Sequence, residues 1–235
     1  MSSDFSECGE ALPPREDRPQ ELARLLAHPF IWRAGHAART QAWPTGFPAL
    51  DEGLPGGGWP RSGLIEILSS RFGMGELALL MPALAAVTCR AGARWCAWIA
   101  PPLQPFAPAL EACGIALERM LIVRGAPHAR RSNRKESWTF EQALGSGACD
   151  IAFAWARQPP PRQIRRLHLA AQRGGTLGVL FRPSWAAREA SPAVLRVTVE
   201  PLAGGARVRL LKSQGGARGA IELKWASQAA LAGHP

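Results

Sequence analysis

The segment EILSSRFGMGELALL, which begins at Glu66, has the layout of a phosphate-binding loop. It follows a short apolar run and precedes a longer one, and a glycine-rich turn at a helix N-terminus can direct backbone N–H groups at phosphates. Aligning Gly75 with the second glycine of the motif places Ser69 near the first glycine. Glu76 then takes the position of the phosphate-binding lysine, and Leu77 that of the hydroxyl residue that holds Mg²⁺.

These two replacements remove the chemistry of the loop while leaving its shape. Two like charges about 4 Å apart repel by roughly 4 kcal/mol at an effective dielectric constant of about 20, so a glutamate opposes a triphosphate that a lysine would attract. The two glycines are expected to preserve the turn. We therefore predict a degenerate phosphate loop that hydrolyses no nucleotide and holds neither cofactor nor metal, built from Ser69, Gly73, Gly75, Glu76 and Leu77.

The 235-residue chain carries a formal net charge of +10, and only three of its basic residues are lysines. Such a balance favours nucleic acid, an acidic protein or an anionic surface as a partner. The basic side chains gather in the loop RGAPHARRSNRK and on one face of a later helix. Each group either contacts phosphates or an acidic partner, or is simply solvated. These candidate binding residues are Arg124, Arg130, Arg131, Arg134, Lys135, Arg162 and Arg166.

Other kinds of site have little support in the sequence. The five cysteines include no C-x-x-C pair and the five histidines are scattered, so we predict no zinc site, no disulfide framework and no catalytic residue. The first residues are acidic and polar, which is not the pattern of a signal peptide. No apolar run approaches the roughly 20 residues of a membrane span. We expect a cytoplasmic protein that does not enter a membrane.

Apolar strands alternate with helices through most of the chain. Three further runs after residue 193 are typical of antiparallel strands joined by glycine turns. This order predicts an α/β domain with a mainly parallel central sheet flanked by helices and an antiparallel C-terminal edge. The predicted strands cover 63–68, 94–100, 119–125, 149–156 and 176–183, and the predicted helices cover 76–91, 105–114, 137–147 and 159–175.

The composition divides the chain into four parts. Residues 1–18 are polar and contain prolines, which predicts a disordered tail. Residues 19–44 have apolar side chains at helical spacing, interrupted by Pro29, and are predicted to form a short helical segment. Residues 45–228 form the folded domain, and residues 229–235 a C-terminal tail.

Several strings resemble the RecA family of ATPase cores, in the order and spacing of that family. TGFPALDEGLPGGGWPRSGLIEI resembles the entry segment and first strand, and WCAWIAPPLQPFAPALEACGIALERMLIVR the second strand, helix and third strand. FEQALGSGACDIAFAWA is similar to the helix and strand that carry the Walker B aspartate, and LLKSQGG to a hairpin that reaches a neighbouring subunit's nucleotide. The resemblance covers about residues 45–228 and implies a RecA-like core.

This resemblance also implies that the core is catalytically inactive. The catalytic glutamate of the family follows the second strand, where this chain has Ala100 and two prolines. Trp155 stands where the Walker B aspartate is expected, and Glu66 resembles a structural acid of the first strand. In the hairpin, Lys212 is retained as a candidate binding residue, but Gln214 replaces a basic residue. The chain is therefore expected not to be an enzyme.

A narrower resemblance is to the ImuA and SulA-like family. It rests on the N-terminal string FIWRA, the tract that runs from Gly147 to FRPSWA, and the ending RVRLLKSQGGARG. It implies an SOS-induced accessory protein of translesion synthesis. The implied partners are ImuB, an inactive Y-family polymerase relative, and through it an error-prone replicative-type DNA polymerase, with RecA and DNA as further candidates. The alternatives are a SulA-type inhibitor of cell division and a DNA-stimulated ATPase with an atypical site.

Overall fold

The computed structural model describes residues 41–73, 75–125, 133–213 and 219–225, which lie within a unit that spans Arg39–Pro235. The predicted tails 1–18 and 229–235, and all but the end of the segment 19–44, lie outside the described residues. The four-part division of the chain therefore stays a prediction.

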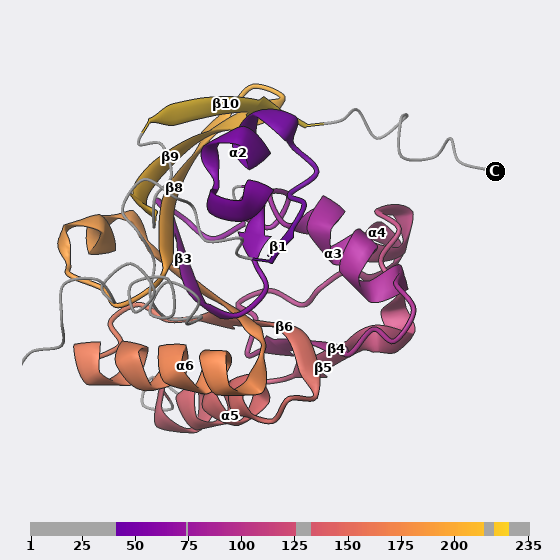
Figure 1. The fold of residues 1–235 in the computed structure, drawn as a ribbon, viewed down its shortest axis with the longest axis vertical. Helices are drawn as coiled ribbons and strands as arrows, with labels where there is room; N and C mark the ends of the chain where they lie inside the picture. The colour runs from indigo at the N-terminus through magenta and orange to yellow at the C-terminus, as the bar shows by residue number, and fades with distance from the viewer. Residues whose placement is uncertain (1–40, 74, 126–132, 214–218, 226–235) are drawn as a thin grey trace, which may run out of the picture. The chain divides into compact units, whose positions relative to one another are not determined.

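An eight-stranded sheet runs through the described unit in the order β10-β9-β8-β3-β7-β6-β4-β5 (Figure 1). The six strands from β3 to β8 pair in parallel, and β9 and β10 extend the sheet in antiparallel fashion. Parallel strands covered on both faces read as continuous apolar runs, which is why the sequence located them. The predicted mainly parallel sheet with an antiparallel C-terminal edge is confirmed. The bounds are β3 (Gly63–Ser69), β4 (Trp95–Ile99), β5 (Met120–Val123), β6 (Cys149–Trp155), β7 (Leu177–Pro183), β8 (Leu195–Leu202), β9 (Gly205–Ser213) and β10 (Ala220–Lys224).

Helices cover both faces of the sheet, and alternate strand residues point to each (Figure 1). On one face, α5 (Asn133–Gly145) and α6 (Pro161–Gly174) bury residues such as Phe140 and Leu167 against Ala152 and Leu180. On the other face, α2, α3 and α4 pack over a larger core that includes Trp98. The remaining elements are α2 (Pro48–Gly53), α3 (Met81–Cys89), α4 (Ala107–Ala112), the 3₁₀ turns η1 (Pro55–Gly57), η2 (Leu117–Arg119) and η3 (Ser184–Arg188), and a two-stranded sheet of β1 (Ala42–Trp43) and β2 (Trp59–Pro60).

Two helices begin four or five residues away from the predicted start. The helix expected from Glu76 starts only at Met81, because residues 76–80 form turns and Pro82 suits the first helical turn. The helix expected from Ser137 already starts at Asn133. Part of the predicted basic loop is therefore helical, and Arg134 and Lys135 lie in the first turn of α5.

A buried ion cluster joins the middle of the sheet to the segment after β7. The Glu66 carboxylate accepts hydrogen bonds from Arg182 on β7 at 3.1 Å and from Arg196 on β8 at 2.6 Å. Arg182 also pairs with Glu189 at 2.6 Å, and Arg196 donates to the carbonyl oxygens of Glu189 and Ala186. Glu66 is thus a structural acid that holds the segment around η3 onto the sheet.

A second ion cluster lies at the amino edge of the parallel sheet. Asp150, at the start of β6, is buried and accepts from Arg90 at 2.7 Å and from the Arg94 backbone and side chain at 2.7 and 2.9 Å. Arg94 donates in turn to the carbonyl oxygens of Gly147, Gly174 and Gly175. Two turns at the amino edge, one after α5 and one after α6, are therefore held by one arginine and its carboxylate.

Candidate functional site

A pocket of about 240 Å³ lies where β3, β4 and β6 end, at the carboxyl edge of the sheet. Open sheets of this class usually bind their ligands outside the carboxyl ends of the strands. One wall is the loop after β3, which contributes Glu76 and Leu77, and another is the segment Pro101–Phe106 after β4. The aromatic rings of Trp98 and Trp155 complete the pocket. We call it the carboxyl-edge pocket.

Aromatic contacts between neighbouring strands build this pocket from below. The ring centroids of Trp98 on β4 and Trp155 on β6 are 5.9 Å apart, and Trp155 stacks on Phe181 of β7 with centroids 4.9 Å apart. Such ring pairs stabilise a packed arrangement beyond the area that they bury. Trp155 therefore forms an apolar wall at the end of β6, where the resemblance to the RecA family predicted an aspartate.

The loop after β3 keeps the predicted turn but closes on its own side chain. Gly73 and Gly75 have φ angles of +85° and +98°, which favour glycine. The buried carboxylate of Glu76 accepts the backbone N–H of Gly73 at 2.5 Å, and the hydroxyl of Ser69 donates to the carbonyl of Arg71. An anion supplied by the loop itself thus occupies an N–H group of the kind that a phosphate loop offers to nucleotide.

The pocket offers little for acid–base or metal chemistry. Among the described residues that line it, Glu76 is the only ionisable one, and its carboxylate is already bound to the loop. The residue after β4 is Ala100, whose N–H donates to the carbonyl of Val123, and two prolines follow. Within the described parts of the chain, no three His, Cys, Asp or Glu side chains gather as a metal site. The described residues also include no helix long and apolar enough to cross a membrane.

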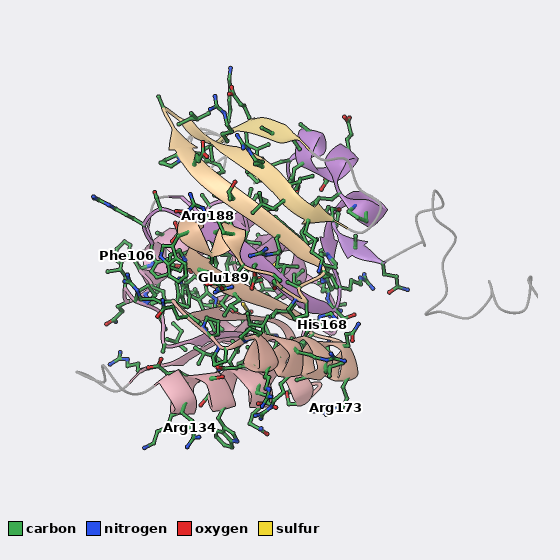
Figure 2. All side chains as sticks on the ribbon, turned by 90° about the vertical axis from the view of Figure 1, so that its left-hand side faces the viewer. Phe106, Arg134, His168, Arg173, Arg188 and Glu189 are labelled. Atoms are coloured by element: carbon green, nitrogen blue, oxygen red, sulfur yellow. The ribbon has the colours of Figure 1, made fainter. Side chains whose placement is uncertain are left out.

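The predicted basic residues that the structure describes lie in three places: on the carboxyl-edge side of the sheet, on the surface between α5 and α6, and near the Glu66 cluster. Arg124 directly follows β5, and Arg134, Lys135 and Arg162 are exposed near the N-termini of α5 and α6; all four therefore belong to the carboxyl-edge side of the sheet. Figure 2 shows Arg134 on the outer side of the molecule. Arg130 and Arg131 lie outside the described residues.

Two of the predicted binding residues have partners within the chain. Arg166 is paired with Glu141 of α5 at 2.6 Å on the surface. Lys212 lies opposite Arg196 in the register of β8 and β9, and its ammonium donates to the carbonyl of Ser191 at 2.8 Å. Partial burial, followed by the charge of Arg196, lowers the pKa of Lys212. Its ammonium therefore belongs to the surroundings of the Glu66 cluster and is not at the carboxyl edge.

The sequence reasoning did not identify the apolar residues of the pocket. Leu103 and Phe106 are 69% and 68% exposed, and Phe106 lies at the surface in Figure 2. A signal was present in the string PPLQPF, where two large apolar residues stand among prolines directly after a buried strand. Arg157, two residues after β6, was also not proposed as a binding residue.

SulA and ImuA are among the known proteins to which this chain is similar. It is 29% identical over 124 residues to the cell division inhibitor SulA of Edwardsiella piscicida, which covers 53% of this chain and 70% of that protein. It is 30% identical over 152 residues to protein ImuA of Caulobacter vibrioides, which covers 63% of this chain and 60% of ImuA. No protein-family model matches the chain. The crystal structure of SulA from Pseudomonas aeruginosa has a TM-score of 0.42 at 26% identity, over 51% of this chain and 97% of that one. The two sequence alignments confirm the predicted resemblance to ImuA and SulA.

Proposed function

We propose that this chain, which has homologues named ImuA and SulA, is a non-catalytic accessory protein of the bacterial SOS response that acts through protein contacts in the cytoplasm. The observation that carries the proposal is the loop after β3. Its Gly73 N–H is bound by the Glu76 carboxylate, and the described residues that line the neighbouring pocket supply no second acid. The strand order with an antiparallel hairpin at one edge supports a RecA-like core over residues 45–228.

The favoured setting is translesion synthesis. The chain would bind ImuB, the inactive Y-family polymerase relative, and through it an error-prone replicative-type DNA polymerase. RecA and DNA are further proposed partners, because exposed arginines follow several parallel strands and suit acidic or phosphate-bearing surfaces. The alignment with ImuA supports this setting, although it covers only 60% of the length of that protein.

A second candidate function is inhibition of cell division by contact with the tubulin-like division protein. The alignment with the SulA of Edwardsiella piscicida favours it, because it covers 70% of that inhibitor at a similar identity. The third candidate, a DNA-stimulated ATPase with an atypical site, would need a cation at the pocket. Arg71 is the exposed cation of the loop after β3, whereas Lys212 is engaged elsewhere.

Parallel pull-downs separate the first two functions. The immobilised full chain is offered purified ImuB and purified division protein from the same host, with the matched tag alone as the control. We expect retention of ImuB and no retention of the division protein. Retention of the division protein without ImuB would replace the first function with the second.

A hydrolysis assay tests the non-catalytic part of the proposal. We expect no release of phosphate from radiolabelled ATP, with or without single-stranded DNA. Turnover that disappears in Arg71→Ala or Lys212→Ala would overturn it. Turnover that persists equally in both variants would point to a contaminating enzyme, which repurification removes.

A further inference from the structure

The carboxyl-edge pocket has an apolar rim that the fold leaves exposed. Leu103 and Phe106 project from the segment between β4 and α4 with more than two thirds of their surface open. Prolines at 101, 102 and 105 restrict this segment, and Phe106 is the N-cap of α4. A rim that is already ordered loses little conformational entropy when a partner covers it.

The pocket is large enough for an aromatic or branched side chain. Its volume is about 240 Å³. An engineered apolar cavity of about 150 Å³ is enough to bind benzene. The walls are made by Leu77, Met81 and Leu110, besides the two tryptophans and the prolines. A ligand group that enters therefore meets mainly carbon, which selects an apolar group over a polar one.

Cations surround the same edge of the sheet. Arg71, Arg124 and Arg157 follow the carboxyl ends of β3, β5 and β6 within two residues, and all three are exposed. None of the three guanidinium groups has an ion pair with another described residue. This contrasts with the Asp150 and Glu66 clusters, where carboxylates hold the arginines. The charge of this edge is therefore complementary to an acidic ligand.

We infer that the carboxyl-edge pocket binds an acidic segment of a partner protein through one or two apolar anchor residues. The anchor would enter between Leu103, Phe106 and Trp155, and flanking carboxylates would lie against the arginines. This inference deepens the proposed function, since it says what kind of partner segment the chain recognises. A nucleotide is disfavoured because Glu76 already occupies the loop N–H.

An acidic segment also fits better than single-stranded DNA. Nucleotide bases can stack on aromatic side chains, and arginines can contact phosphates. A base in this pocket would however bury the polar atoms of its edge among apolar walls, where they lack hydrogen-bond partners. A leucine or phenylalanine anchor has no such atoms. DNA is therefore the competing outcome in the test.

The test uses fluorescence anisotropy with the full chain and labelled peptides, so that no SOS protein is needed. The probe is the acidic peptide DEDLFDED, and the matched probes are DEDSSDED, which lacks the anchor, and KRKLFKRK, which reverses the charge. A labelled single-stranded oligothymidylate forms a fourth arm. We expect the first peptide to bind roughly tenfold or more tightly than either matched peptide, as the loss of an anchor residue typically costs at least that factor.

Variants then locate the binding. Phe106→Ser and Leu103→Ser should weaken the acidic peptide roughly tenfold, whereas Leu169→Ser, a similarly exposed leucine on α6, should not change it. The double substitution of Arg71→Glu and Arg157→Glu should also weaken binding of the acidic peptide, whereas Arg209→Glu on β9 should not. Circular dichroism would verify that each variant folds. Equal binding of the anchored and anchorless peptides, or tighter binding of the oligonucleotide that depends on Phe106, would overturn the inference.

The two proposals fail in different ways. If the peptide binds at the pocket but ImuB is not retained in the pull-down, the proposed function is wrong and the pocket inference stands. If Phe106→Ser retains ImuB as well as the unchanged chain does, and the peptide does not bind, the function stands and the inference is wrong.

Discussion

The two edges of the parallel sheet use their charges in opposite ways. At the amino edge, the buried Asp150 carboxylate binds two arginines, and Arg94 holds two turns through three of their carbonyl oxygens. At the carboxyl edge, exposed arginines surround an apolar pocket, and the one carboxylate among its described lining residues is turned into its own loop. The comparison separates charge that stabilises the fold from charge that is left for a partner.

The largest effect is expected in the middle of the sheet, where charge is fully buried. Glu66→Gln removes the carboxylate that neutralises Arg182 and Arg196. Loss of one member of a buried ion pair costs about 3–5 kcal/mol of folding stability, because the remaining charge is buried without compensation. Urea unfolding measures this, with the exposed Glu200→Gln on β8 as control, expected within about 0.5 kcal/mol. Equal losses in both variants would contradict a structural role for Glu66.

The amino edge should show the next largest effect. Asp150→Asn leaves Arg90 and Arg94 without their carboxylate, but both arginines are about one third exposed and water partly compensates. We expect a loss of about 2–3 kcal/mol in the free energy of unfolding, below the range for a fully buried pair. The exposed Glu111→Gln is the matched control. A loss no greater than that of the control would mean that the amino edge is not held by this carboxylate.

The same substitution should become less harmful in acid. Burial alone would raise the pKa of Asp150, but the hydrogen bonds from Arg94 and the charge of Arg90 outweigh it and lower the pKa. The stabilisation is therefore present above the unfolded pKa of about 3.9 and is lost as the pH falls through the lower folded pKa. The difference in stability between the unchanged chain and Asp150→Asn should be full at pH 7 and shrink below about pH 4. A difference that is constant between pH 7 and pH 3 would contradict it.

The loop at the carboxyl edge should show a smaller effect. Gly75→Ala places a Cβ atom at a φ of +98° and 3.3 Å from the ring of Trp225. Strain of this kind costs about 1–3 kcal/mol, and we expect the low end because the ring can shift. Thermal unfolding would measure it against Ala78→Gly in the same loop. An unchanged stability would mean that the turn is not the rigid wall that the pocket needs.

The smallest effect on stability is expected at the rim of the pocket. Phe106→Ser and Leu103→Ser should change the free energy of unfolding by less than about 0.5 kcal/mol, because both side chains are mostly exposed. By contrast, Asp150→Asn at the amino edge is expected to lower the free energy of unfolding. Losses above about 2 kcal/mol for the rim variants would show that the rim belongs to the core and would remove the contrast between the edges.

The sequence predicted the order of strands better than the contacts between them. Continuous apolar runs identified β4, β6 and β7, because burial on both faces leaves little room for polar residues. The predicted start of α3 was wrong, since the apolar residues at 77–80 suit a helix but lie in turns, and the helix begins at Met81 with Pro82 in its first turn.

The candidate site was only partly predictable, because some of its features are local in the sequence and others depend on contacts between distant residues. Glycines at 73 and 75 and the acid at 76 are local features, so the degenerate loop could be located from the sequence alone. The pocket instead depends on Trp98 and Trp155, which are far apart in the chain and meet only through the parallel pairing of β4 and β6. The ion pair between Arg94 and Asp150 also joins distant parts of the chain and could not be predicted from the sequence. Long-range register, which periodicity does not encode, decides these contacts.

The hydrogen bond between Glu76 and Gly73 limits which side chains position 76 can accept. A lysine at position 76 would bury an ammonium where the Glu76 carboxylate now accepts a hydrogen bond, and would set it against an N–H donor. Burying an uncompensated charge costs several kcal/mol. Glu76→Lys would therefore destabilise the loop instead of preparing it for a nucleotide. The loop is therefore locked by its own anion, so that a single substitution at position 76 cannot turn it into a cation-bearing loop.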